Sequence, residues 1–264
     1  MRRPNTLWIY MKHLLERYAR SGIWWAVVIS FYISMLLVVY PTFVESGTLD
    51  LDRFPEFIVE AFDIPDMTQP TVFLEQQVFG NLPLILPFFL LMAFAGAIAG
   101  AEDRGALDIL VTNPIPRRNV VLAHWISAVL VLTGIVLIVA VVMWAVAQIM
   151  NLDVTIGAAL RGVLNLLPIT VAFGTLGLAL SAKLRASGVV IGSVFAFIFL
   201  QNLMEILSNL VPSLDWLGKL SVFHYYGNAM TEGVPWGSAA FLSAIALGLL
   251  AVAVWLFQKR DIYT

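Results

Sequence analysis

Long apolar runs alternate with short polar connections along almost the whole chain. A helix needs about 20 mostly apolar residues to cross the hydrocarbon core of a bilayer. The sequence therefore predicts six transmembrane helices, at residues 22–44, 79–101, 120–148, 158–182, 187–211 and 238–257. No linker or charged block marks off a second unit, so we expect one all-α transmembrane domain over residues 1–264, with its first span retained as an anchor.

A short amphipathic segment precedes the first span. In TLWIYMKHLLERYARSG, residues 6–22, apolar side chains follow one helical face and charges follow the other. This pattern is typical of a helix that lies in the membrane interface. We therefore expect an N-terminal interfacial helix that leads into the span at 22–44, anchored in the membrane or in contact with a partner.

A second amphipathic segment, GALDILVTNPIPRRNVV, lies between the second and third spans. Leu107, Leu110 and Val111 have the i, i+3, i+4 spacing of one apolar helical face. Pro114 ends the pattern, because the residue before a proline is pushed out of the α conformation. We expect a short surface helix at 106–113, which packs against its own helix ends or docks on a cytoplasmic partner.

The composition and charge distribution agree with a membrane protein and predict its orientation. Hydrophobic residues make up 60% of the chain and charged residues 12%, whereas soluble domains have about 25% charged residues. Basic residues alternate across the six predicted spans, which places both termini in the cytoplasm. The outer loop at about 45–78 is acidic instead, and its stretch FPEFIVEAFDIP predicts an amphipathic helix on the outer face.

Polar side chains interrupt the fifth predicted span. Gln201, Glu205 and Ser208 share one helical face, and an ionisable residue inside a span is by default a functional candidate. Glu205 lies about 27 Å along the helix from Ser187 at 1.5 Å per residue, which puts it near the outer surface. These residues either line a translocation path, with Arg161 and Asn165 as partners, or are simply hydrated.

Enzymatic chemistry finds little support in the sequence. Cysteine is absent, so thiol catalysis and cysteine-bound metals are excluded. The histidines fall at different depths of the predicted bundle, and neither H-E-x-x-H nor G-x-S-x-G occurs. The P-loop pattern is also missing, since Gly218-Lys219 lacks the upstream glycine and precedes Leu220. We expect no catalytic, cofactor-binding or metal-binding residue on this chain.

Several stretches in order resemble the ABC-2 type ABC transporter permeases. AGAEDRGALDILVTNPIPRRNVVLAHW resembles the segment through which these permeases couple to their ATPase, although Ala106 and Asp108 replace residue types common there. FPEFIVEAFDIPDMTQPTVFLEQQVF, which precedes it, resembles the first outer loop of the family, and FGTLGLALSAKLRASG resembles its fourth span and the basic turn that follows. SVFHYYG resembles the outer segment before the last span, and WLFQKRDIY resembles the usual terminus. The resemblance covers nearly the whole chain.

The resemblance implies a permease subunit of a plasma-membrane exporter. It implies a dimer with a second copy or a related permease, in contact with the lipid bilayer and not with nucleic acid. It also implies a separate ATP-binding subunit that holds ATP and magnesium. The residues implied to contact that subunit are Glu102, Asp103, Arg104, Gly105, Leu107, Leu110, Val111, Pro114, Arg117 and Arg118. An ion-gradient-driven six-span carrier is the alternative, because prolines in spans two and four could break helices. The transported molecule is not identified by any of these residues.

Overall fold

The computed structural model describes residues 6–48, 66–97, 116–184 and 186–259, and its regular secondary structure is helical, with no strand among these residues. Six helical runs are long and apolar enough to cross a membrane. Both findings confirm the predicted all-α transmembrane class. The helices expected at 106–113 and within FPEFIVEAFDIP lie outside the described residues.

The first helix is longer than expected. α1 (Thr6–Glu45) is continuous over 40 residues, or about 60 Å at 1.5 Å per residue, twice the thickness of the hydrocarbon core. The expected interfacial helix and the first span are therefore one helix. The apolar face of its first half packs on the bundle, because Leu14 and Tyr18 are buried in the protein core.

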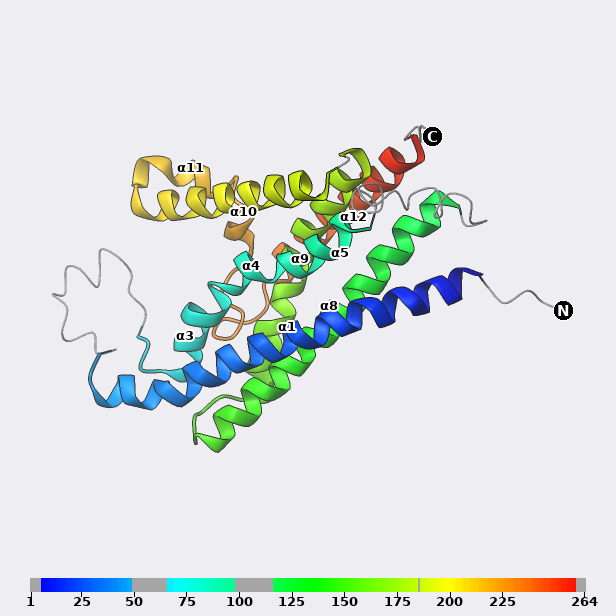
Figure 1. Cartoon of the computed structure of the whole chain (residues 1–264). Helices are drawn as coiled ribbons and strands as arrows, with labels where there is room; N and C mark the ends of the chain where they lie inside the picture. Colours follow the sequence, from blue (N-terminus) through cyan, green and yellow to red (C-terminus); the bar gives the residue numbers. More distant parts are fainter. Residues whose placement is uncertain (1–5, 49–65, 98–115, 185, 260–264) are drawn as a thin grey trace.

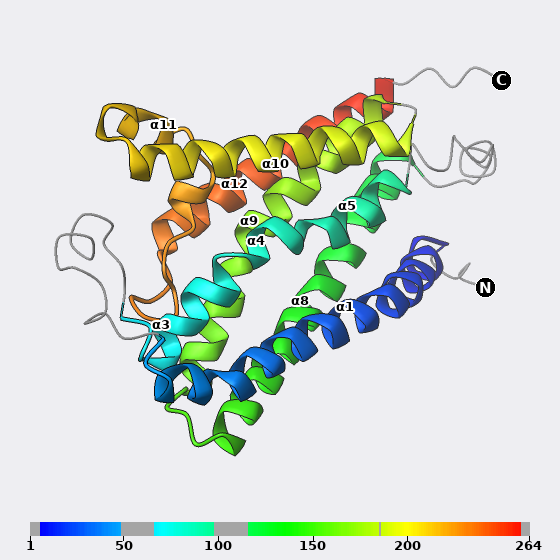
Figure 2. The ribbon, with the colours of Figure 1, turned by 60° about the vertical axis from the view of Figure 1, so that its left-hand side comes forward.

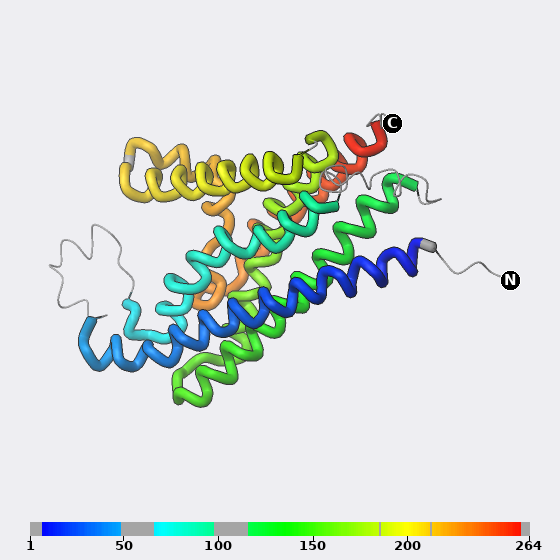
Figure 3. Tube along the Cα trace, in the orientation of Figure 1, coloured from blue at the N-terminus to red at the C-terminus, as the bar shows by residue number. Residues whose placement is uncertain are grey.

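The second span is broken into short pieces and begins earlier than expected. It comprises α3 (Pro70–Leu74), the π-helical turn η2 (Glu75–Phe79), α4 (Leu82–Ile85) and α5 (Pro87–Ala95), which Figure 3 shows as successive offsets of the tube. Pro83 and Pro87 stand in the first positions of α4 and α5, where a missing backbone N–H is tolerated. The start predicted at residue 79 is wrong, because the buried apolar side chains extend back to Phe73.

The remaining four spans agree with the sequence to within a few residues. They are α8 (Arg117–Ile149), α9 (Ile156–Lys183), α10 (Ser187–Leu210) and α12 (Trp236–Lys259). Pro168 lies inside α9 without ending it. Three short pieces connect the last two spans, namely η3 (Pro212–Leu214), α11 (Asp215–Gly218) and η4 (Phe223–Tyr225).

α9 forms the centre of the bundle and contacts α5, α8, α10 and α12. α1 packs mainly on α8, and α1 and α10 lie at opposite edges in both Figure 1 and Figure 2. Glycines let α9 approach the second span closely. A Cβ atom at Gly174 would lie 2.5 Å from the Cβ of Leu90, and one at Gly177 would lie 2.4 Å from Leu91 Cδ2.

The ends of the helices gather at two ends of the bundle. α1, α8 and α10 begin at the end where α5, α9 and α12 finish, as Figures 1 and 2 show. We call this the basic end, because its described helix termini carry Lys12, Arg17, Arg117, Arg118, Lys183 and Lys259. α3 and α11 lie at the opposite end. The chain therefore alternates between two ends, as six crossings require.

Candidate functional site

A polar cavity of about 380 Å³ lies at the end opposite the basic end. Its walls come from η2, from the last turns of α10 and from the segment around η4. The lining contains two carboxylates, four side-chain amides and no lysine or arginine: Glu75, Gln76, Phe79, Gly80, Asn202, Glu205, Asn209, Phe223, His224, Tyr226, Gly227 and Asn228. The cavity therefore offers hydrogen-bond acceptors and negative charge.

Glu75 joins the second span to the segment that follows η4. Its Oε2 accepts hydrogen bonds from the backbone N–H of Met230 at 2.7 Å and of Thr231 at 3.2 Å, and the residue is only 5% exposed. Glu75 also begins the π-helical turn, in which the N–H of Gly80 donates to the Glu75 carbonyl at 2.9 Å. Such turns are frequent at functional sites. Sequence reasoning counted Glu75 among the acids of the outer loop and missed its burial.

Two buried polar atoms of the lining have no hydrogen-bond partner among the described residues. They are Oε2 of Glu205 and the hydroxyl of Tyr226. Oε1 of Glu205 lies 4.0 Å from Nδ1 of His224. Burial, and secondarily the charge of Glu75, raises the pKa of Tyr226 well above its usual value, so this hydroxyl stays protonated. Buried polar atoms without partners are uncommon and require an explanation.

Arg161 and Asn165, considered as partners of Glu205, bond elsewhere. Nη2 of Arg161 donates to the carbonyl of Met230 at 3.2 Å, and Nδ2 of Asn165 donates to the carbonyl of Tyr226 at 2.6 Å. Both side chains therefore hold the segment 226–230 against α9. They shape the wall of the cavity from behind, and the basic side chain beside Glu205 is His224 instead.

The three residues singled out on α10 have different surroundings. Oε1 of Gln201 accepts the N–H of Val222 at 2.9 Å, and the Gln201 carbonyl accepts the hydroxyl of Ser221 at 3.1 Å. The hydroxyl of Ser208 donates to the Glu205 carbonyl, one turn back on the same helix. Of the three, Glu205 alone lines the cavity. Gln201 fixes the loop that carries η4.

Replacing Gln201 by leucine is expected to destabilise the chain by about 1 kcal/mol, because the part-buried N–H of Val222 loses its acceptor. Reversible unfolding in SDS, followed by tryptophan fluorescence, measures this loss. Gln258→Leu, at an exposed position on α12, is the matched control and should change little. Equal stability of the two variants would show that Gln201 does not hold the loop.

The residues expected at the ATPase contact lie mostly outside the described part of the chain. This holds for Glu102, Asp103, Arg104, Gly105, Leu107, Leu110, Val111 and Pro114. Arg117 and Arg118 begin α8. Nη1 of Arg117 lies 3.5 Å and 3.4 Å from the carbonyls of Phe257 and Gln258. A cation at the end of a helix is favourable there, so the start of α8 is tied to the end of α12.

A buried histidine links three helices near the same end. Nε2 of His124, on α8, is 2.8 Å from the Tyr10 hydroxyl, and Nδ1 is 2.6 Å from the Tyr18 hydroxyl. The Tyr18 hydroxyl also lies 3.4 Å from the carbonyl of Ala93 in α5. This cluster explains why the first half of α1 packs on the bundle. No local signal in the sequence indicates the partners of His124.

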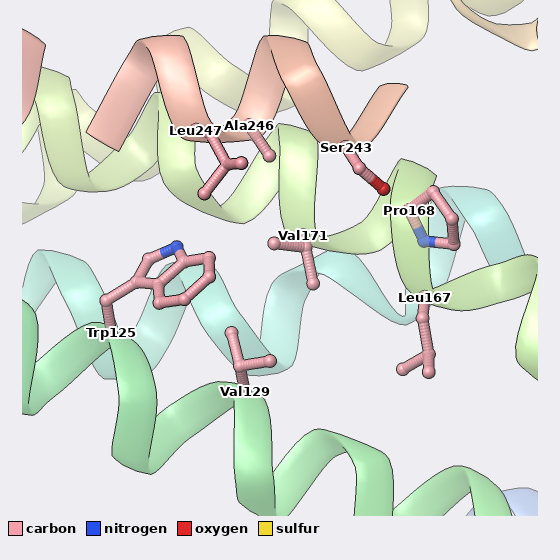
Figure 4. A pocket seen from close by; sticks show the side chains of 8 residues that line it. All are labelled: Trp125, Val129, Leu167, Pro168, Val171, Ser243, Ala246 and Leu247. Atoms are coloured by element: carbon pink, nitrogen blue, oxygen red, sulfur yellow. The ribbon is translucent and has the colours of Figure 1, made fainter. Parts of the chain in front are cut away.

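A second cavity, of about 240 Å³, is apolar and lies between α8, α9 and α12. Figure 4 shows the Trp125 ring, Pro168 and Leu247 around it, each from a different helix. The indole N–H of Trp125 is already bonded to the Thr175 hydroxyl at 2.9 Å, and Ser243 bonds within its own helix. With no free polar group directed into it, this cavity suits hydrocarbon rather than polar chemistry.

Comparison with known proteins supplies one further finding. No curated protein matches the chain. The model of one protein family, described as ABC-2 family transporter protein, matches residues 7–262.

Proposed function

Because this chain belongs to the ABC-2 family of transporter proteins, of which it is a membrane-spanning permease, we propose that it forms one half of an ATP-driven exporter. A separate cytoplasmic subunit binds ATP and magnesium and hydrolyses the ATP. The observation that carries this proposal is the family match over residues 7–262, which takes in all six spans. This chain forms the transport path, and its partner catalyses ATP hydrolysis.

The basic end faces the cytoplasm in this proposal. Short connections rich in lysine and arginine stay on the cytoplasmic side of membranes, and such residues occur at the helix termini of this end. Both chain termini are then cytoplasmic, and the polar cavity opens toward the outer face. The acidic connection between α1 and α3 lies on the outer side as well.

Residues 98–115 connect α5 to α8 at the basic end, and they supply the contact with the ATPase. The contacts of the described neighbours support this role. α5 is linked through Ala93 to Tyr18 of α1, and α8 is linked through Arg117 to α12. A displacement of this connection therefore reaches four helices. ATP favours one arrangement of these helices only to the extent that it binds that arrangement better.

The second permease half, identical or related, packs along α10 and the second span. α10 is the least buried span, and a Cβ atom at Gly188 or Gly192 would meet nothing within 4 Å. Small residues four positions apart allow helices to approach closely in membranes. By contrast, side chains of the same chain already occupy the space beside the glycines in the middle of α9.

Affinity capture of the tagged chain from its native membranes tests the proposal. We expect a tag on the chain to capture an ATPase that carries a P-loop, and we expect the reconstituted complex to hydrolyse ATP faster than the ATPase alone. The same tag expressed without this transmembrane chain is the control. Transport that runs on an ion gradient, without ATP or an ATPase, would contradict the proposal and favour the carrier alternative.

A further inference from the structure

A cleft of about 170 Å³ lies between the first half of α1 and the second half of α5, toward the basic end of the bundle. Two contacts fix the separation of the two helices here. The Tyr18 hydroxyl donates to the Ala93 carbonyl at 3.4 Å, and the rings of Trp25 and Phe89 meet edge to face with centroids 6.3 Å apart. The lining consists of Arg17, Tyr18, Ser21, Phe89, Met92 and Ala93.

Arg17 gives this cleft a positive charge that no described side chain neutralises. Its guanidinium group forms no ion pair or hydrogen bond with a described residue, and the same is true of the Ser21 hydroxyl, one helical turn further along α1. No carboxylate occurs in the lining. A guanidinium group presents its N–H donors as a planar fork that matches the oxygens of a phosphate. The cleft therefore offers charge and donors to an anion.

The position of Arg17 along α1 matches the headgroup layer of a bilayer. The apolar run of the first span begins at residue 22, five residues or about 7.5 Å further along the helix. The headgroup layer on each side of the hydrocarbon core is about 5–8 Å thick. Because α1 lies at an edge of the bundle in Figures 1 and 2, lipid molecules reach the cleft directly from the surrounding membrane.

The surface of α1 changes from polar to apolar in the order found in a phospholipid. Arg17, Ser21, Trp24 and Val28 follow one helical face at spacings of four, three and four residues. Trp24 is 71% exposed and Val28 is 62% exposed, and Met92 of α5 is exposed beside them. Tryptophan is enriched at the level of the headgroups. A soluble anion would use the first two side chains only, whereas a phospholipid uses the whole row.

We propose that this cleft binds the phosphodiester group of an anionic glycerophospholipid from the leaflet at the basic end. Arg17 pairs with the phosphate oxygens, Ser21 donates to one of them, and an acyl chain lies along Trp24, Val28 and Met92. Basic pockets between membrane helices are suited to anionic headgroups, and a volume below the about 300–1,000 Å³ of small-molecule pockets suits a compact one. The inference does not depend on the proposed function, because it concerns binding by this chain alone.

Native mass spectrometry of the whole chain in detergent, without any ATPase, tests the binding. The probe is palmitoyl-oleoyl-phosphatidylglycerol, and phosphatidylcholine with the same acyl chains is its neutral counterpart. Sodium glycerol 3-phosphate is the soluble anion. We expect one phosphatidylglycerol molecule to bind about tenfold more tightly than phosphatidylcholine. Glycerol 3-phosphate should not displace it, because this anion makes no contact with the apolar part of the row.

Three variants separate the cleft from general attraction of anionic lipid to a basic surface. Arg17→Gln should weaken the binding of phosphatidylglycerol about tenfold, because a charge-assisted pair is lost. Ala93→Leu should weaken it about threefold at unchanged charge, because the larger side chain fills the cleft. Lys12→Gln is the matched control and should bind like the original chain. Lys12 is exposed on the same helix, five positions and therefore about 140° away from Arg17.

Thermal unfolding of the lipid-free variants, followed by circular dichroism, separates loss of binding from loss of folding. Arg17 and Lys12 are exposed, so we expect both glutamine variants to unfold at the temperature of the original chain. Equal affinity for the two lipids, displacement by glycerol 3-phosphate, unchanged affinity in Arg17→Gln or Ala93→Leu, or an equal loss in Lys12→Gln would overturn the inference. Failure to capture an ATPase would instead contradict the proposed function, and lipid binding would stand.

Discussion

Replacing Leu110 and Val111 together by aspartate is expected to uncouple this permease from its ATPase. Both residues belong to the apolar face predicted for residues 106–113. Two carboxylates on that face would have to lose their hydration in an apolar groove, which is strongly unfavourable without a partner charge. We expect the stimulation of ATP hydrolysis in proteoliposomes to fall about tenfold or more, which corresponds to ~1.4 kcal/mol or more of coupling.

Two aspartates on the opposite face of the same predicted helix provide the matched control, because they add the same charge. Ile109 and Thr112 project from a helix over 106–113 away from Leu110, so Ile109→Asp with Thr112→Asp should retain most of the stimulation. Both double variants are expected to insert normally, because the changes lie outside the six spans. Full stimulation by the Leu110 and Val111 variant, or equal loss in both, would show that this face does not dock.

Gly174→Val is expected to cost about 3 kcal/mol of stability, the largest effect of any single substitution considered for the bundle. A Cβ atom at this position would lie 2.5 Å from Cβ and 2.6 Å from Cδ1 of Leu90. Leu90 is fully buried, and its Cβ cannot move unless the backbone of α5 moves with it. The substitution therefore separates α9 from the second span. Unfolding in SDS measures the loss.

Gly192→Val serves as the control for this substitution. Nothing lies within 4 Å of a Cβ atom at Gly192, and valine is a better helix former than glycine. We expect the isolated chain to unfold like the original, and a change in self-association would report on the second permease half. Equal destabilisation by both substitutions would show that helix chemistry, rather than close packing, explains the effect at Gly174.

Spans three to six could be predicted from the sequence because each is a long, mainly apolar run bounded by polar residues. The first half of α1 could not, because its amphipathic pattern suits a membrane surface and a groove on a neighbouring helix equally well. The choice depends on His124, which bonds Tyr10 and Tyr18 from positions 114 and 106 residues away. No local pattern contains such a contact.

The candidate cavity was predictable only in part, for the same reason. The helical spacing of the polar residues identified Glu205 and its neighbours on α10 as candidates. The burial of Glu75 depends on backbone N–H groups 155 and 156 residues further along the chain, and Tyr226 lies in a stretch without regular periodicity. Val78 and Phe79, at i+3 and i+4 from Glu75, were the available signal, because a carboxylate that shares a helical face with apolar residues points to a buried acid rather than a loop acid.

The uninterrupted course of α1 has a mechanical consequence. The proline of this helix, Pro41, lies close to its far end, so the helix before it behaves as a stiff rod. A tilt of about 5° over a rod of ~60 Å moves its far end by about 5 Å. Motion imposed near Tyr10 and Tyr18 thus arrives at Glu45, on the other side of the bilayer, along an edge of the molecule remote from α10.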